Sequence, residues 1–301
     1  MKAFDSTIFR LPLPDKHRFP MAKYSRLAAR IRAELPEVEL LEAPRAHRHQ
    51  LARVHCPNYI QAVFDGTLTK AAVRRIGFPW SDALVERSRR SVGATIAAAM
   101  CAKDDLIAVN LAGGTHHAHR DFGSGFCVFN DVAVATRHLR TEGVSRIAIL
   151  DLDVHQGDGT ATLFQDDPEV LTISIHCEQN FPFRKASSDH DCGLAVGAGD
   201  QEYLTEVERA LVLAQEFKPD AVFYIAGADP FIDDSLGQLN VTNEGLRQRD
   251  ALLFSTFTQQ KIPIAVSMGG GYCKDIDRIV ELHFQTVQLA LKYTSSFEGI
   301  N

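Results

Sequence analysis

The sequence contains no run of about 18 apolar residues, the length that a helix needs to cross a bilayer. Its first residues show no charged segment followed by an apolar core, so no secretory leader is predicted. The six cysteines form no CxxC pair and have no zinc-ribbon spacing. In a chain of 301 residues, such scattered cysteines favour reduced thiols, and we expect a cytoplasmic protein.

The chain also lacks an excess of positive charge. The chain has 32 Lys and Arg against 38 Asp and Glu, a net charge of −6, and so lacks the basic surface that binds nucleic acids or anionic membranes. It also lacks repeats, low-complexity stretches and a Pro/Gly/Ser-rich linker. We expect one domain over residues 1–301, with no nucleic-acid partner and no membrane partner.

Short apolar runs alternate with amphipathic helical patterns. This order is typical of an α/β fold in which helices cover both faces of a parallel sheet. The predicted strands are 106–109, 146–150, 170–175, 221–225 and 262–267. The predicted helices are about 20–34, 83–101, 131–142, 201–217, 243–260 and 275–293.

The unusual polar residues come just after predicted strands. They are the pair His116 and His117, the segment 151–158, Asp229 and the segment 269–272. In open parallel sheets, ligands bind beyond the carboxyl ends of the strands because the loops there converge. We therefore expect these four segments to form one site.

The segment 151–159, DLDVHQGDG, indicates a metal site. Alternation along an extended chain places Asp151, Asp153 and His155 on one face. Buried carboxylates need a neutralising charge, which a metal ion supplies, whereas a helix cap would explain one aspartate and not three with a histidine. Asp229 completes a set of one imidazole and two carboxylates, which suits catalytic zinc but also iron(II) or manganese.

The adjacent His116 and His117 lie in the segment GGTHHAH. Alone, they are equally compatible with a surface histidine cluster or with two more metal ligands. Beside a metal site they are expected to be the acid and base of a metal-assisted hydrolysis, because water must lose a proton and the leaving amine must gain one. Asp151 and Asp158 are the expected partners that orient and tune the two imidazoles.

Tyr272 follows three glycines at the end of a predicted strand. A glycine run suggests a phosphate loop, but no GK[ST] or GxGxxG pattern accompanies it. The glycines more plausibly turn the backbone sharply and present Tyr272 to the site, where its phenol would donate a hydrogen bond to an oxyanion. A lone tyrosine would more often pack in the core, so this role depends on the whole constellation.

The motifs GGTHHAHRDFGSGFCVFND, DLDVHQGDG, GAD and GGGY, in this order, resemble the zinc-dependent histone deacetylase family. The resemblance runs from His17 to the last helix and is strongest to the class IV group and its bacterial relatives. It implies a single-domain arginase/deacetylase-like α/β fold with a mostly parallel eight-stranded sheet and helices on both faces. It also implies that residues 1–301 form one histone deacetylase-like catalytic domain.

The same resemblance assigns roles to the site residues. Asp153, His155 and Asp229 would hold one Zn²⁺. His117 would be the general base and acid, with His116 as its electrostatic partner. Asp158 would pair with His117, Asp151 with His116, and Tyr272 would bind the carbonyl and then the oxyanion.

Family members bind the substrate in a narrow tunnel. The matching residues are Gly125, whose carbonyl would accept the amide N–H, Phe126 with either Phe181 or Phe183 as tunnel walls, and Leu236 near the mouth. Members also bind a structural K⁺ or Na⁺. The positions that match this cation site are Asp151, Asp153, His155, Ser174 and Ile175.

The reaction implied is removal of acetyl or longer acyl groups from lysine side chains of a protein. The sequence leaves open a small acylated amine such as a polyamine, although no acidic surplus surrounds the tunnel residues. No clear counterpart exists of the rim aspartate that grips a peptide backbone in some members; Asp82 and Asp65 are the candidates. Two rival interpretations of these motifs are an arginase-type ureohydrolase and a catalytically silent metal-binding protein. Against the first, Gly157 leaves too few ligands for a second catalytic metal ion.

Overall fold

The computed structural model describes residues 1–7, 11–14 and 17–298. Within these residues, eight strands form one sheet in the order β2-β1-β3-β8-β7-β4-β5-β6, and every neighbouring pair is parallel. The strands are β1 (Lys2–Asp5), β2 (Glu39–Glu42), β3 (Ile107–Asn110), β4 (Ile147–Asp151), β5 (Val170–Cys177), β6 (His190–Leu194), β7 (Ala221–Ala226) and β8 (Ile264–Met268). This sheet confirms the predicted arginase/deacetylase-like fold.

The five strands predicted from apolar runs are present, and the three that were not predicted are short. Of these, β2 and β6 form the two edges of the sheet, where their side chains are only partly buried. An edge strand faces solvent and needs no continuous apolar run, so its sequence carries little signal.

Ten helices are present in the described part of the chain. The six that were predicted are α1 (Ala22–Glu34), α5 (Asp82–Asp105), α6 (Asp131–Thr141), α8 (Asp200–Phe217), α9 (Asn243–Gln259) and α10 (Ile276–Glu298). Four shorter ones were not predicted: α2 (Arg48–Leu51), α3 (Pro57–Asp65), α4 (Lys70–Ile76) and α7 (Asp158–Phe164). None of the helices in the described ranges has the length and apolar character of a membrane span.

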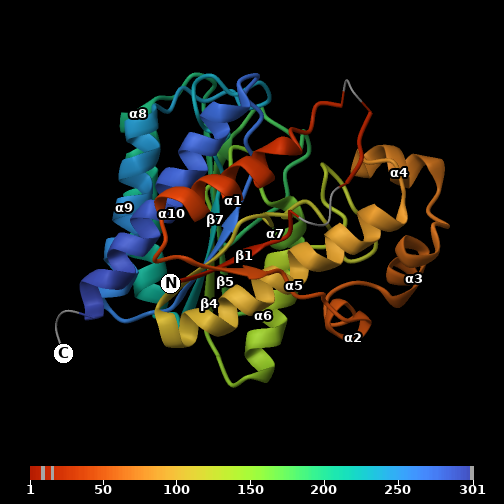
Figure 1. Ribbon diagram of the computed structural model, residues 1–301, viewed down its shortest axis with the longest axis horizontal. Helices are drawn as coiled ribbons and strands as arrows, with labels where there is room; N and C mark the ends of the chain where they lie inside the picture. Colours follow the sequence, from red (N-terminus) through yellow and green to blue (C-terminus); the bar gives the residue numbers. More distant parts are fainter. Residues whose placement is uncertain (8–10, 15–16, 299–301) are drawn as a thin grey trace.

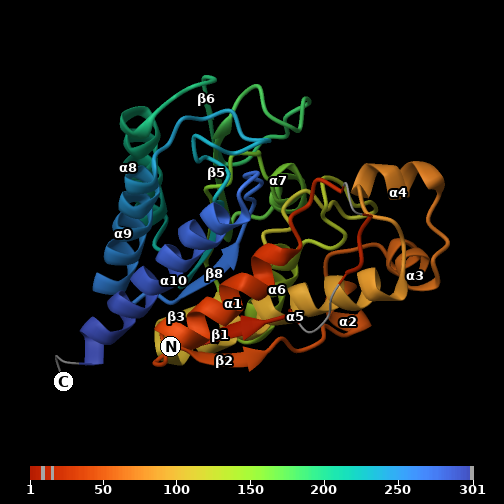
Figure 2. The same ribbon diagram turned by 45° about the horizontal axis from the view of Figure 1, so that its top comes forward.

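The helices cover both faces of the sheet because its central strands alternate their side chains between two cores. In β7, Val222 and Tyr224 pack with α1, α8, α9 and α10, while Ala221 and Phe223 pack with α3, α5 and α6. Figure 1 shows α8, α9 and α10 on one side of the sheet and α2 to α6 on the other. Figure 2 shows the same two layers from a second direction.

The strand order explains how the polar segments meet. The strands β3, β8, β7 and β4 are consecutive neighbours in the sheet, and all run in the same direction. Their carboxyl ends lead into the segments that contain His116 and His117, Tyr272, Asp229 and Asp153. Residues more than 150 positions apart in the chain therefore lie together beyond the carboxyl ends of these central strands.

Candidate active site

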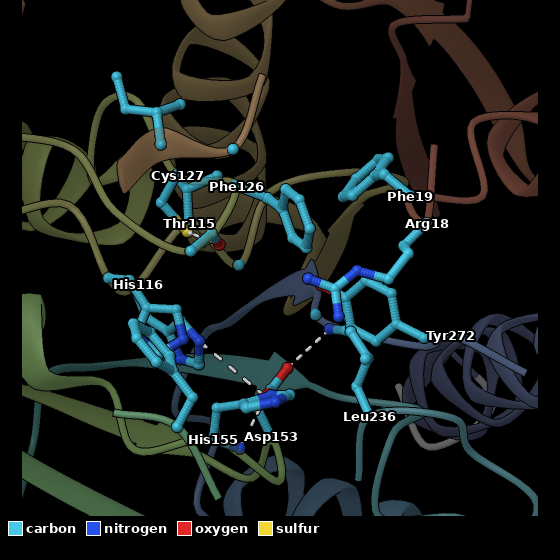
Figure 3. A pocket seen from close by; sticks show the side chains of 18 of the residues that line it. Arg18, Phe19, Thr115, His116, Phe126, Cys127, Asp153, His155, Leu236 and Tyr272 are labelled. Carbon is cyan, nitrogen blue, oxygen red and sulfur yellow. Dashed lines mark hydrogen bonds and ion pairs between the residues drawn. The ribbon is translucent and has the colours of Figure 1, made fainter. Parts of the chain in front are cut away.

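Asp153, His155 and Asp229 form a buried cluster in which one ligand atom from each residue lies within 4.8 Å of the others. The Nδ1 atom of His155 lies 3.0 Å from Oδ1 of Asp153 and 3.2 Å from Oδ2 of Asp229. Figure 3 shows Asp153 and His155 together at one side of the pocket. The structure therefore brings the three predicted metal ligands together.

Backbone N–H groups fix the two carboxylates. Asp229 Oδ1 accepts a hydrogen bond from the Val154 N–H (3.0 Å), and Asp153 Oδ2 accepts one from the Gly270 N–H (2.6 Å). Gly270 must be glycine here, since a Cβ at this position would lie 1.7 Å from Asp229 Oδ2. The glycine run before Tyr272 thus lets the backbone approach the carboxylates closely.

The cluster fits a divalent cation. Asp229 Oδ2 is fully buried, and its polar neighbour His155 Nδ1 is hydrogen-bonded to Asp153 instead, so this oxygen lacks the partner that buried oxygens normally have. Burial, together with the charge of Asp153, raises the pKa of Asp229 to about 7. A bound cation would satisfy this oxygen and neutralise the charge, and the N/O donor set matches zinc, with iron(II) and manganese also compatible.

Each histidine of the pair donates to its own carboxylate. His116 Nδ1 lies 2.6 Å from Asp151 Oδ2, and His117 Nδ1 lies 2.6 Å from Asp158 Oδ1. Because an ionised carboxylate only accepts, Nδ1 of each ring carries a proton. This leaves Nε2 of a neutral His117 with a free lone pair, as a general base requires.

The two imidazoles differ in electrostatic environment although their rings are 4.1 Å apart. Burial lowers the pKa of His117 to about 4, with a further contribution from the charge of His116. Burial also disfavours the charged form of His116, but Asp151 and Asp153 outweigh it and raise its pKa to about 9. The surrounding groups thus favour a neutral His117, the form that can accept a proton, and a charged His116.

His119 is a site residue to which the sequence analysis gave no role. Its Nε2 lies 3.1 Å from Asp158 Oδ2, so Asp158 is held between two histidines. Burial disfavours ionisation of Asp158, but the hydrogen bonds from His117 and His119 outweigh it and lower its pKa. The spacing of His117 and His119, two residues apart in the sequence, was the signal that could have predicted this role of His119.

Residues from distant segments hold the histidine loop in place, and no sequence motif announced them. The Asn130 amide donates to the Ala118 carbonyl (3.3 Å), and Asp131 Oδ1 accepts from the Thr115 N–H (2.7 Å). His55 contacts the His119 carbonyl through Nδ1 (2.9 Å), and its Nε2 accepts from the Asn130 N–H (3.0 Å). The orientation of His116 and His117 therefore depends on a buried polar network.

Tyr272 lies across the pocket from His116 (Figure 3). Its N–H donates to Asp234 Oδ2 (2.6 Å), and its ring meets that of His155 edge-on, with 6.3 Å between centroids. Burial raises the pKa of the phenol well above its usual value, so the hydroxyl remains protonated and can donate. Asp234 is a supporting residue that the motifs did not indicate.

A cavity of about 430 Å³ leads to the cluster, and Gly125, Phe126, Phe181, Phe183 and Leu236 all line it. The Phe181 ring packs edge-on against His117, with 4.9 Å between centroids, whereas Phe183 is 87% exposed at the mouth. A Cβ on Gly125, whose φ is +51°, would lie 2.6 Å from His117 Cδ2. Of Phe181 and Phe183, the two candidates for the second wall, Phe181 is the inner one because it packs on His117 while Phe183 faces solvent. Neither Asp82 nor Asp65 is among the described lining residues.

The residues matched to a monovalent cation are also neighbours. Asp151 pairs in register with Ser174 across β4 and β5, so Ser174 and Ile175 lie beside the metal-binding segment. Asp151 Oδ1 accepts from the Asp153 N–H (3.3 Å), while Ser174 Oγ lies 3.0 Å from His176 Nδ1. This arrangement is compatible with a cation at these carboxylate and hydroxyl oxygens but does not demand one.

A metal-binding triad, a histidine pair backed by carboxylates and a tyrosine on the opposite side are the parts that a metal-dependent amidohydrolase requires. Residues 17–287 match the family model described as the histone deacetylase domain, and the chain belongs to this family of hydrolytic deacetylases. It is 46% identical to an uncharacterized protein of Picosynechococcus (90% of this chain, 92% of that one). It is 31% identical to Histone deacetylase 2 of Arabidopsis thaliana (88% and 72%). A crystal structure of a histone deacetylase homolog from Aquifex aeolicus superimposes with a TM-score of 0.81 at 24% identity (96% and 83%), which shows the shared fold.

Proposed function

We propose that this enzyme removes acetyl or longer acyl groups from lysine side chains, with zinc as the metal and residues 1–301 as one catalytic domain. The observation that supports the proposal is that Asp153 and His155, with Asp229 beside them, lie at a cavity that Phe126 and Phe181 also line. A cavity with aromatic walls suits the apolar stem of an acylated lysine.

The substrate is held by its stem and its amide. The rings of Phe126 and Phe181 flank the methylene chain, and the Gly125 carbonyl accepts the amide N–H. Leu236 contacts the stem near the mouth. This grip places the acyl carbonyl beside the metal ligands, within reach of His117 and Tyr272, and converts a bimolecular reaction into one between fixed groups.

His117 performs the proton transfers. Its Nε2 takes a proton from the attacking water, while Nδ1 stays bonded to Asp158 and the resulting imidazolium is stabilised there. His117 then gives the proton to the departing amine as the C–N bond breaks, yielding a lysine and a carboxylate. His116, held by Asp151, remains a cation beside the reacting groups.

Zinc held by Asp153, His155 and Asp229 would act as a Lewis acid on the acyl carbonyl and would lower the pKa of water. Tyr272 donates a hydrogen bond from its phenol to the oxyanion that forms on the acyl oxygen when the carbonyl is attacked. A structural K⁺ or Na⁺ at Asp151, Asp153, His155, Ser174 and Ile175 would offset the negative charge behind this site. We place the enzyme in the cytoplasm, in line with its reduced cysteines.

The test is acyl release by the zinc-loaded protein from lysine peptides that carry acyl chains of increasing length, with an acetylated polyamine as a parallel substrate. We expect turnover of at least one lysine peptide, with bound zinc near one per chain. Turnover of the polyamine alone would contradict the lysine assignment. Zinc binding without release of any acyl group would instead identify a silent metal-binding protein.

A further inference from the structure

The mouth of the cavity carries positive charge that the proposed chemistry does not use. Arg18, Arg74 and Arg75 line the cavity and are exposed to solvent. Among the described residues that line it, only Asp153 has a carboxylate, and that group is a proposed metal ligand. The charge met by an approaching substrate is therefore positive.

The outer arginines are exposed, although Arg75 lies over the Phe122 ring at 4.7 Å, whereas the cations deeper in the cavity are buried. Lys23 and Arg87 also line it, but both are buried against the rings of Phe19 and Tyr24. Figure 3 shows the Arg18 side chain extending from the segment of Phe19 toward the open centre of the pocket. No ion pair joins Arg18 to a carboxylate in the part of the chain that the structure describes, so its charge is available to a ligand.

The rim also has an apolar element that a small amine would not use. Phe183 is 87% exposed, the most exposed large hydrophobic side chain of the described residues, and its ring meets that of Phe181 at 6.2 Å. A residue next to an acyl-lysine in a polypeptide would cover this ring while the lysine stem enters between Phe181 and Phe126. Exposed apolar surface beside a pocket is typical of a docking surface.

We propose that the mouth selects acyl-lysines whose neighbouring residues are acidic, with Arg18, Arg74 and Arg75 as the specificity-determining residues. This inference rests on the proposed deacylase function and names its substrate class. The arginines bind carboxylates of the flanking residues and repel polyamines and lysine-rich tails. None of them touches the reacting atoms, so the preference acts on substrate binding and appears in KM rather than in kcat.

The size of the effect follows from the exposure of the arginines. An exposed ion pair changes a binding constant by about 1.5- to 5-fold. Two such pairs, together with repulsion of a basic flank, give about a tenfold preference for an acidic over a basic peptide. Because salt screens exposed charges, the preference should shrink between about 0.05 M and about 1 M salt.

The experiment uses three capped peptides with the same acyl-lysine, flanked on both sides by Glu, Gln or Lys. We expect kcat/KM to fall in the order Glu, Gln, Lys, with about a tenfold difference between the ends at low salt. The ratio of the Glu to the Lys peptide should fall to about three in Arg18→Gln and in the double variant Arg74→Gln/Arg75→Gln, since each variant keeps about half of the free-energy difference. Arg209→Gln is the matched control, because Arg209 is an exposed arginine of α8 that does not line the cavity.

The proposal would be overturned if the wild-type ratio of kcat/KM for the Glu peptide to that for the Lys peptide were below about two. It would also be overturned if this ratio changed no more in Arg18→Gln and in the double variant than in Arg209→Gln. Comparing the two peptides on one variant cancels any general loss of activity or of folded protein. Failure of all three peptides to react would instead contradict the deacylase function, and with it the specificity built on it.

Discussion

Replacing Gly270 with alanine would place a methyl group where the carboxylate of Asp229, a proposed zinc ligand, now lies. The added Cβ would sit 1.7 Å from Asp229 Oδ2 and 2.8 Å from Asp153 Oδ2. An ordinary contact between carbon and oxygen is about 3.3 Å, so the Asp229 carboxylate would have to move by about 1.5 Å. Metal sites tolerate displacements of about 0.2 Å, and one of the three ligands would therefore be lost.

We expect Gly270→Ala to weaken zinc binding by about 100-fold or more, since even changes behind the ligands cost 10- to 100-fold. The assay is competition with a chromogenic chelator, combined with circular dichroism to show that the fold is kept. Gly199→Ala is the control, because its Cβ would meet no atom closer than 3.8 Å. Gly270→Ala with wild-type zinc affinity and a native spectrum would refute the assignment of Asp229 as a ligand.

Three further predictions concern the tyrosine, the tunnel and the histidine loop. Tyr272→Phe should lower kcat about 100-fold or more while zinc stays bound, and unchanged kcat would rule out the oxyanion role. Gly125→Ala should lower kcat/KM because the added Cβ would lie 2.6 Å from His117 Cδ2. Its zinc affinity should equal that of wild type. Full activity of this variant would contradict the proposed substrate tunnel. Burial lowers the pKa of His55 to about 4, below the usual value of 6.5, so the unfolded chain gains a proton as the pH falls from 6.5 while the folded chain does not. The stability that neutral His55 provides above pH 6.5 should thus decline by about 3 kcal/mol toward pH 4. Chemical unfolding should show that the free energies of unfolding of wild type and His55→Gln come closer together over this pH range. A difference between them that stays constant with pH would contradict the prediction.

The interior of the fold was predictable because its strands are buried on both faces. Runs such as 221–225 and 262–267 are apolar almost throughout, and the structure confirms them as β7 and β8. No continuous apolar run marks the edge strands β2 and β6 or the short helix α7. In α7, the first residue is Asp158 itself, so one residue both begins a helix and supports His117.

The residues that the structure brings together were predictable where they lay in contiguous motifs, as in the segments 113–119, 151–159 and 269–272. The residues that support them were not, because His55, Asn130 and Asp234 come from segments whose proximity only the folded chain creates. The choice between Phe181 and Phe183 likewise needed coordinates. Both flank Pro182, and nothing in the sequence tells which ring packs on His117 and which faces solvent.

The most direct test of the central claim is acyl release from an acyl-lysine peptide by zinc-loaded wild type and by His117→Ala, with bound zinc measured in the same samples. The account predicts that wild type releases the acyl group as a carboxylate. It also predicts that His117→Ala loses at least about 100-fold in kcat, with zinc still near one per chain. Equal turnover by the two proteins would contradict the assignment of His117 as the base, and no turnover by zinc-loaded wild type would contradict the deacylase function.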